Sequence, residues 1–274
     1  MSLGIAFKGT EGIVLAADSR VTLMAQMQNP ETPNQSVFLP ATFDNATKIL
    51  CVKDHKYAGV VTYGLGAIGT QEFRTAHSFL PEIEAEFNDP GRLSVENFAN
   101  KISAFFMRQW AQSMPPDYAG NPMIFLVGGY DEGVAYGSIF EIIIPHNPTP
   151  AERNPGIFGI VWGGQREFAD RLIQGYDPEL PSTVQNFLQL SDENKENLER
   201  ELKAKLSTKI PYQFLPLQDC VDLSIFLIRT TVTLQNWIIG VRGVGGAIDV
   251  ATITRTEGFN PIQQKKITGE KSII

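Results

Sequence analysis

The sequence predicts an α+β fold in which two antiparallel sheets stack on each other and helices cover the outside. Segments with strand character and segments with helical periodicity come in separate blocks, in the order strands, helices, strands, helices, strand. Short turns between consecutive strands, such as the glycine-bounded turn at 9–12, are typical of antiparallel pairing. A chain of 274 residues, 43% of them hydrophobic, can bury one large core, so we expect a single domain over residues 1–274.

The strands are predicted from apolar, β-branched and aromatic runs that end at turn-forming residues. These runs cover residues 2–8, 13–17, 48–52, 57–63, 123–127, 139–144, 158–162 and 247–254. Residues 24–46, between the second and third of these runs, carry three prolines and many polar residues. This composition predicts a long surface loop that forms a wall of a cleft.

The helices are predicted from apolar residues that recur every three or four positions. They cover residues 70–80, 94–110, 165–175, 191–206 and 217–237, and Ser94 is a typical N-cap. In the helix at 191–206, Glu and Lys stand four residues apart beside a stripe of leucines. This pattern predicts an inserted, solvent-exposed helix, with a contact to a partner subunit as the alternative.

Composition excludes several classes of function. The net charge of −7 and the absence of a Lys/Arg-rich run argue against nucleic-acid or anionic-membrane partners, so we expect a neutral or peptide-like partner. Cys51 and Cys220 lie far apart, and the three histidines have no metal-ligand spacing, so we expect no disulfide, metal or cofactor. The sequence has no apolar run of membrane-spanning length and no signal-peptide pattern at its start, which predicts a cytoplasmic protein.

Residues 64–69 match the pattern G-x-G-x-x-G after a predicted strand and before a predicted helix. A dinucleotide site of this kind also needs an acidic residue about 20 positions later, at the end of a second parallel strand. The acidic residues Glu82, Glu84 and Glu86 lie instead beyond Pro81 in a helical or turn segment. We therefore interpret the pattern as a glycine turn, with nucleotide binding as the weaker alternative.

The start of the chain offers a nucleophile. Methionine aminopeptidase removes Met1 before a small residue, which would leave Ser2 with both a hydroxyl and a free α-amine. An α-amine with a pKa near 8 can accept a proton from the hydroxyl at neutral pH. A strand that begins at Ser2 and pairs with residues 13–18 brings Asp18 close to the chain start. Asp18 beside Lys48 would hold the ammonium in place, although a surface salt bridge is the ordinary alternative for such a pair.

Five segments resemble proteasome β-type subunits and their bacterial relatives. They are SLGIA at 2–6, GIVLAADSRVT at 12–22, TKI at 47–49, FLVGGYD at 125–131 and GGAIDVATITR at 245–255. Asp18 follows Ser2 by sixteen residues, as the aspartate of that family follows its N-terminal threonine. The resemblance covers most of the chain except insertions at about 24–46 and 178–216.

The resemblance implies an N-terminal-nucleophile (Ntn) hydrolase fold, a four-layer αββα sandwich, in a homo-oligomeric ring that cleaves peptide bonds. It makes Ser2 the nucleophile, Lys48 and the Ser2 amine the proton-transfer groups, and Asp18 and Arg20 the groups that support Lys48 and the site. It also makes the backbone N–H of Gly64 the oxyanion donor, with Thr62 as the alternative.

Three positions depart from the family pattern. The supporting serine becomes Gly163, and an aspartate and a serine become Val241 and Val244. Ser2 also lacks the γ-methyl that restrains the side chain of threonine. These departures keep two alternatives open: a non-catalytic ring or scaffold subunit, and a transpeptidase or small-amide acylase of the same fold.

Overall fold

The structure, a computed structural model, describes residues 2–29, 32–70, 72–88 and 91–269. In this part of the chain the strands form two five-stranded sheets and one two-stranded ribbon. The first sheet has the order β10-β1-β2-β11-β12 and the second has the order β5-β6-β7-β8-β9, with neighbours antiparallel throughout. The prediction of an α+β fold with antiparallel sheets is thus confirmed.

The strands of the two sheets are β1 (Leu3–Lys8), β2 (Ile13–Asp18), β5 (Ile49–Leu50), β6 (Ala58–Gly64), β7 (Met123–Gly129), β8 (Ser138–Ile144), β9 (Asn147–Glu152), β10 (Gly159–Gly164), β11 (Ile248–Thr254) and β12 (Gly258–Gln263). The helices are α1 (Leu80–Glu86), α2 (Val95–Ser113), α3 (Glu167–Ile173), α4 (Leu180–Leu188), α5 (Asp192–Leu206) and α6 (Leu217–Gln235), with short 3₁₀ turns at Ala76–Phe79 and Tyr212–Phe214. The predicted helices at 94–110, 191–206 and 217–237 are confirmed as α2, α5 and α6, and the Ser94 hydroxyl accepts the N–H of Asn97 as an N-cap.

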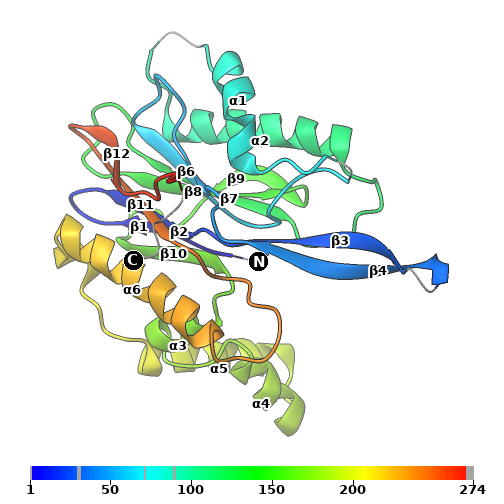
Figure 1. Ribbon diagram of the computed structural model, residues 1–274. Helices are drawn as coiled ribbons and strands as arrows, with labels where there is room; N and C mark the ends of the chain where they lie inside the picture. Colours follow the sequence, from blue (N-terminus) through cyan, green and yellow to red (C-terminus); the bar gives the residue numbers. More distant parts are fainter. Residues whose placement is uncertain (1, 30–31, 71, 89–90, 270–274) are drawn as a thin grey trace, which may run out of the picture.

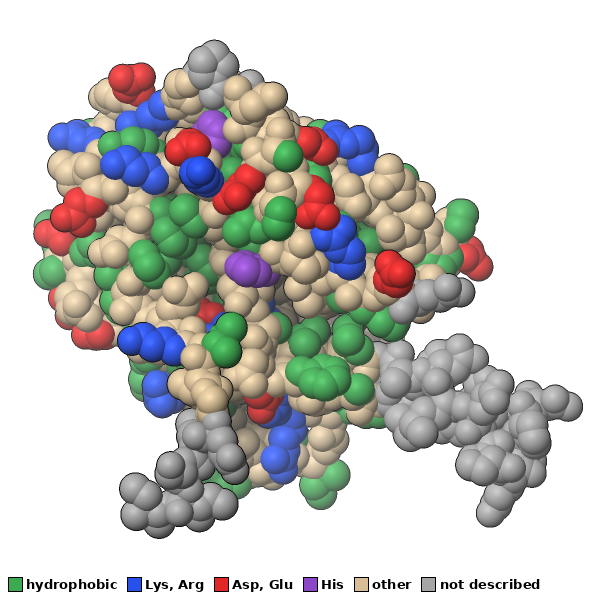
Figure 2. Space-filling model, turned by 45° about the horizontal axis from the view of Figure 1, so that its top comes forward, with side chains coloured by type: hydrophobic (Ala, Val, Ile, Leu, Met, Phe, Trp, Pro, Cys, Tyr) green, Lys and Arg blue, Asp and Glu red, His purple; other side chains and the backbone are tan. Residues whose placement is uncertain are grey.

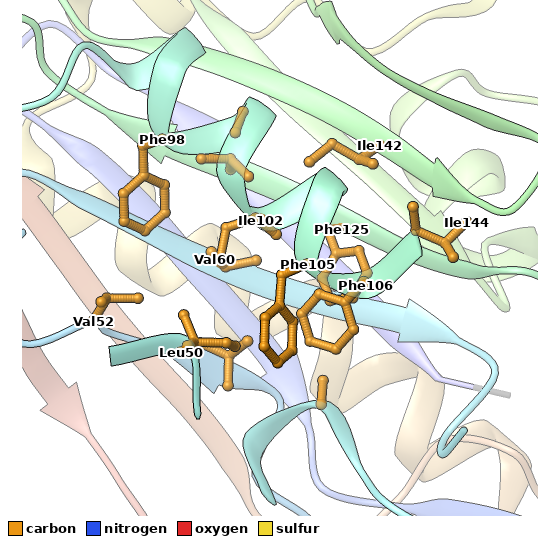
Figure 3. Packing of buried hydrophobic residues seen from close by; sticks show 14 of the residues in the cluster. Leu50, Val52, Val60, Phe98, Ile102, Phe105, Phe106, Phe125, Ile142 and Ile144 are labelled. Atoms are coloured by element: carbon orange, nitrogen blue, oxygen red, sulfur yellow. The ribbon is translucent and has the colours of Figure 1, made fainter. Parts of the chain in front are cut away.

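Helices lie on both sides of the sheets (Figure 1): α1 and α2 on one side, and α3 to α6 on the other. The apolar face of α2 packs on the second sheet, where Phe98, Ile102, Phe105 and Phe106 point toward the strands (Figure 3). Each of these buried side chains stabilises the fold by roughly 1.5–3 kcal/mol relative to exposure. The helix α6 covers the first sheet in the same way.

Between the two sheets lies a third apolar cluster, contributed by both sheets. It contains Ala6, Ile13, Leu15, Ala17, Val61, Tyr63, Leu126, Tyr130, Ile139, Val161 and Ile253. Strands β1 and β2 are fully buried because they receive side chains from α6 on one face and from the second sheet on the other. This double burial explains their continuous apolar sequences.

The prediction of a loop at 24–46 was wrong. Residues 24–29 belong to β3 (Val21–Asn29) and residues 32–43 form β4 (Thr32–Phe43), an antiparallel ribbon that projects from the body of the molecule (Figure 1). Proline is tolerated there because each strand of a two-stranded ribbon has an open edge, where a missing N–H breaks no ladder bond.

The predicted helix at 70–80 begins later than expected. Ile68 and Arg74 form an isolated antiparallel bridge with two reciprocal backbone hydrogen bonds of 2.8 Å, and the helical segment begins only at the 3₁₀ turn Ala76–Phe79. This arrangement also disfavours the nucleotide alternative for residues 64–69. A dinucleotide site needs parallel strands around the glycine loop, whereas β6 is antiparallel to both of its neighbours.

Acidic and basic side chains are interspersed on the face of the molecule that Figure 2 shows. In the described residues, no helix combines the length and hydropathy needed to span a bilayer. Within the same residues, no group of three or more His, Cys, Asp or Glu side chains is placed to hold a metal ion.

Candidate active site

Asp18, the last residue of β2, is completely buried and lies at the centre of the candidate site. Among the described residues, four donors reach its carboxylate. The Leu3 N–H and the Lys48 ammonium donate to Oδ1 at 3.0 and 2.7 Å, and the Arg20 and Gly245 N–H groups donate to Oδ2 at 3.0 Å each. These bonds satisfy both oxygens, which is the condition under which a buried carboxylate is tolerated.

Lys48 lies just before β5 and is 5% exposed. Burial lowers the pKa of its ammonium, because water no longer solvates the charge, while the negative charge of Asp18 and their hydrogen bond raise it. Burial dominates, so the pKa lies below the ordinary value of a lysine. A lysine in this environment releases its proton more readily than one on the surface.

Ser2 is 2% exposed and immediately precedes β1. Its backbone carbonyl accepts the N–H of Gln165 at 2.8 Å, and the next peptide N–H, that of Leu3, is held by Asp18. Ser2 and Lys48 line the same cavity, which has a volume of about 10 Å³. The structure therefore brings together Ser2, Asp18 and Lys48, while Met1, whose removal the chemistry requires, lies outside the described residues.

The Arg20 side chain binds away from the Asp18 carboxylate. Its guanidinium makes a bidentate bond to Asp44, at 2.5 and 2.8 Å, and donates to the carbonyl of Arg242 at 3.3 Å. The hydrogen bonds with Arg20 lower the pKa of Asp44 and raise that of Arg20. A Cβ at Gly245 would lie 2.4 Å from the guanidinium carbon, so a side chain there would displace Arg20 from its present position. Arg20 thus fixes the loop whose N–H reaches Asp18.

The backbone donor proposed for an oxyanion lies at the end of β6. Gly64 has φ +85°, a conformation that favours glycine, and a Cβ there would lie 2.3 Å from the Pro122 carbonyl oxygen. The N–H of Thr62 donates to the Lys48 carbonyl at 2.9 Å, which disfavours Thr62 as the donor. Leu65 and Gly66, which follow Gly64, line the cavity next to Ser2.

The structure explains part of the departures from the family pattern at positions 163, 241 and 244. A Cβ at Gly163 would lie 2.3 Å from the ring of Tyr63, whose hydroxyl donates to Glu141 at 3.0 Å. The tyrosine ring therefore occupies the space that a serine side chain would need. Val244 is buried with its N–H bonded to Gln235, whereas Val241 is half exposed and lies outside the contacts of Asp18.

Sequence reasoning missed several groups that shape this site. Asp44, Gln235 and the N–H of Gly245 lie far from Asp18 in the sequence or belong to the backbone, so no residue pattern marks them. The side chain of Gln165 also bonds that of Gln235. The glycine pair at 245–246 belongs to one of the segments that carried the family resemblance. It marked the position of this loop in the sequence but not the contacts that the loop makes.

Comparisons with known proteins find matches among solved structures. No protein-family model matches the sequence, and no curated protein matches it. Three similar solved structures are Anbu proteins. The Anbu complex from Pseudomonas aeruginosa, a helical assembly, has TM-score 0.55 and 14% identity over 98% of this chain and 88% of that one. The Anbu (Gly-1) mutant from Hyphomicrobium sp. strain MC1 has TM-score 0.54 and 12% identity over 99% and 89%, respectively. Anbu from Yersinia bercovieri, described as an ancestral beta-subunit, has TM-score 0.52 and 14% identity over 95% and 87%, respectively.

These matches correct the family expected from the sequence. The assignment to proteasome β-type subunits was wrong, because the similar structures are Anbu proteins. Four of the five segments that carried the resemblance contain β1, β2, β11 and most of β7, which build the sheets of the fold. The chain shares its fold with Anbu proteins.

Proposed function

We propose that this protein is an N-terminal-nucleophile amide hydrolase that acts on peptides, with Ser2 as the nucleophile after removal of Met1. One observation carries the proposal: the buried Asp18 carboxylate holds both the Lys48 ammonium and the peptide N–H next to Ser2. A charge pair with this geometry places a lysine of lowered pKa beside a residue that can carry hydroxyl and amine together.

In the proposed reaction, the Ser2 hydroxyl oxygen attacks the substrate carbonyl and its proton passes to the α-amine of the same residue. The positive charge of Lys48, oriented by Asp18, stabilises the oxygen as it loses the proton. The backbone N–H of Gly64 would donate to the oxyanion of the tetrahedral intermediate. The amine then gives the proton to the leaving nitrogen, and a water molecule hydrolyses the resulting ester.

The cavity beside Ser2 is consistent with the last step. Its volume of about 10 Å³ is close to the space that one water molecule needs. Among the described residues the Thr62 hydroxyl, which lines this cavity, is buried without a hydrogen-bond partner. A water molecule there would satisfy Thr62 and lie next to the acylated Ser2.

We propose that the whole chain is one Ntn-type domain, with helix layers outside two stacked sheets and insertions at about 24–46 and 178–216.

We also propose that the protein forms a homo-oligomer. The loop after α6 exposes four large apolar side chains within five residues, a surface that subunit contacts commonly cover. These residues are Trp237, Ile238, Ile239 and Val241. The P. aeruginosa Anbu complex forms a helical assembly, which supports an oligomer and leaves ring or helix to experiment.

Mass spectrometry and a single variant test the catalytic proposal. Intact-mass measurement should show a chain that begins at Ser2, and a retained Met1 would refute the proposal. Wild type should hydrolyse members of a panel of fluorogenic peptide amides, and Ser2→Ala should abolish turnover. Added amines should leave hydrolysis as the main outcome, whereas ligated product would identify a transpeptidase.

A second candidate function rests on the altered positions. Tyr63 fills the space at Gly163, and valines stand at 241 and 244, so the polar groups that proteasome β-type subunits carry near the amine are missing here. A non-catalytic assembly subunit would need none of them. Identical turnover by wild type and Ser2→Ala, or no turnover by either, would favour this function.

A further inference from the structure

The peptide unit that joins Ser2 to Leu3 is held at both ends. Its carbonyl accepts the N–H of Gln165 at 2.8 Å, and its N–H donates to Asp18 at 3.0 Å. These two anchors come from different parts of the chain, since Gln165 follows β10 and Asp18 ends β2. The orientation of residue 2 therefore depends on how well the two anchors are fixed relative to each other.

Hydrogen bonds through the end of α6 connect the anchors. The Gln165 side-chain carbonyl accepts from the Gln235 amide, and the Gln235 side-chain carbonyl accepts the N–H of Val244 at 2.8 Å. The next residue, Gly245, donates its N–H to Asp18 at 3.0 Å. The bonds thus run in a closed circuit from the Ser2 carbonyl through Gln165, Gln235 and the 244–245 loop to Asp18, and back to the Leu3 N–H.

The direction of each bond in this circuit is determined. A backbone N–H can only donate, so Val244 requires the oxygen of the Gln235 amide. The side-chain nitrogen of Gln235 must then face Gln165, and the side-chain oxygen of Gln165 accepts its hydrogen bond. Gln235 is 4% exposed, so water does not compete for these bonds. Glutamine is required at 235 because the side chain accepts from one neighbour and donates to the other.

We infer that Gln165 and Gln235 are positioning residues for the nucleophile, and that their amide pair orients residue 2 in place of the polar groups replaced at 163, 241 and 244. The inference rests on the proposed function for its catalytic meaning. Its structural content, a coupling between the Gln235 side chain and the Ser2–Leu3 peptide, is independent of any activity.

The experiment compares Gln235→Glu and Gln235→Leu with Gln218→Glu, a matched change at an exposed position of the same helix. Each chain is made as a ubiquitin fusion whose cleavage exposes Ser2, so that the fate of Met1 in the cell does not matter. The glutamate variant keeps the acceptor for Val244 and loses the donor to Gln165, whereas the leucine variant loses both. Gln165→Ala removes the same link from a half-buried position and supplies a variant that folds if changes at 235 do not.

Two measurements follow. Amide hydrogen exchange should become at least tenfold faster at Leu3 in the 235 variants and in Gln165→Ala, and it should be unchanged in Gln218→Glu. Acylation of Ser2 by a β-lactone, followed by mass spectrometry across pH, should slow roughly 10²-fold. The shape of its pH profile should also change, because the amine loses its fixed place as proton acceptor, whereas a lower stability alone would not alter that shape.

The outcomes separate the two ideas. Leu3 exchange and acylation equal to those of Gln218→Glu in every circuit variant would overturn the positioning role. Faster exchange at Leu3 in the variants, with no acylation of wild type at any pH, would refute the proposed chemistry and leave the positioning of residue 2 intact.

Discussion

Replacing Asp18 with Asn should destabilise the fold strongly and in a pH-dependent way. The buried carboxylate receives Leu3, Lys48, Arg20 and Gly245 as donors. An asparagine amide offers one acceptor oxygen in place of two, so donors that met the other oxygen lose their partner. It also leaves the Lys48 ammonium buried without its counter-charge. Breaking a buried pair on one side costs about 3–5 kcal/mol of unfolding free energy, and we expect the loss to fall in this range.

The pH dependence follows from the lowered pKa of Lys48. A lysine whose pKa is lower in the folded state binds more protons when unfolded, so stability rises with pH between the folded and the unfolded pKa. Removal of Asp18 lowers the folded pKa further and widens this window. The destabilisation should therefore be largest where Lys48 is charged and shrink as it becomes neutral. Urea unfolding of wild type and Asp18→Asn, from pH 6 to about pH 10, measures the effect.

The double variant Asp18→Asn with Lys48→Met provides the control. Because it removes the stranded charge, it should recover part of the lost stability and lose the rise with pH. A cost below about 1 kcal/mol for Asp18→Asn, or a cost that does not vary with pH, would show that the pair is not the buried, satisfied unit described here.

Three further changes test separate parts of the structure. Gly163→Ala places a Cβ 2.3 Å from the Tyr63 ring and should cost about 1–3 kcal/mol; thermal unfolding unchanged from wild type would contradict the packing. Asp44→Asn should cost only about 0.2–1 kcal/mol at neutral pH, because the Asp44 side chain is 44% exposed. Since Arg20 lowers the pKa of Asp44, this contribution is present at neutral pH and is lost as pH falls through the lowered value, so wild type and variant should converge in acid. Ile239→Asp should shift the protein toward monomers of 30.3 kDa by light scattering, and an unchanged mass would exclude this loop as a subunit contact.

The sequence predicted the parts of the fold whose signals are local. The helix after Ser94 has a capping residue and a long apolar face, and its start was predicted within one residue. The ribbon at 21–43 was not predicted, because its prolines and polar residues are compatible with strands only where an edge is open, and openness is a property of the tertiary fold. Strands β9 and β12 were missed; β9, Asn147–Glu152, contains two prolines and charged or polar residues and is largely exposed.

The candidate site also combines contacts that local sequence signals predict with contacts that only the tertiary fold creates. The closeness of Asp18 to the start of the chain could be predicted because a hairpin places the end of β2 beside the start of β1. No local pattern fixes the contact of Asp18 with Lys48, which the structure shows at 2.7 Å. The catalytic roles of these residues remain predictions. The Gln165–Gln235 link could not be predicted, because it joins residues seventy positions apart through side chains that carry no recognisable motif.

The root of the projecting ribbon has a mechanical consequence. Val21 begins β3 and Phe43 ends β4, these two residues pair with each other, and the ion pair between Arg20 and Asp44 clamps the chain just outside them. A strand of nine residues extends about 30 Å, so the ribbon is a lever whose pivot lies two residues from Asp18. A displacement of the ribbon would therefore reach this ion pair first and, through the backbone N–H of Arg20, the Asp18 carboxylate.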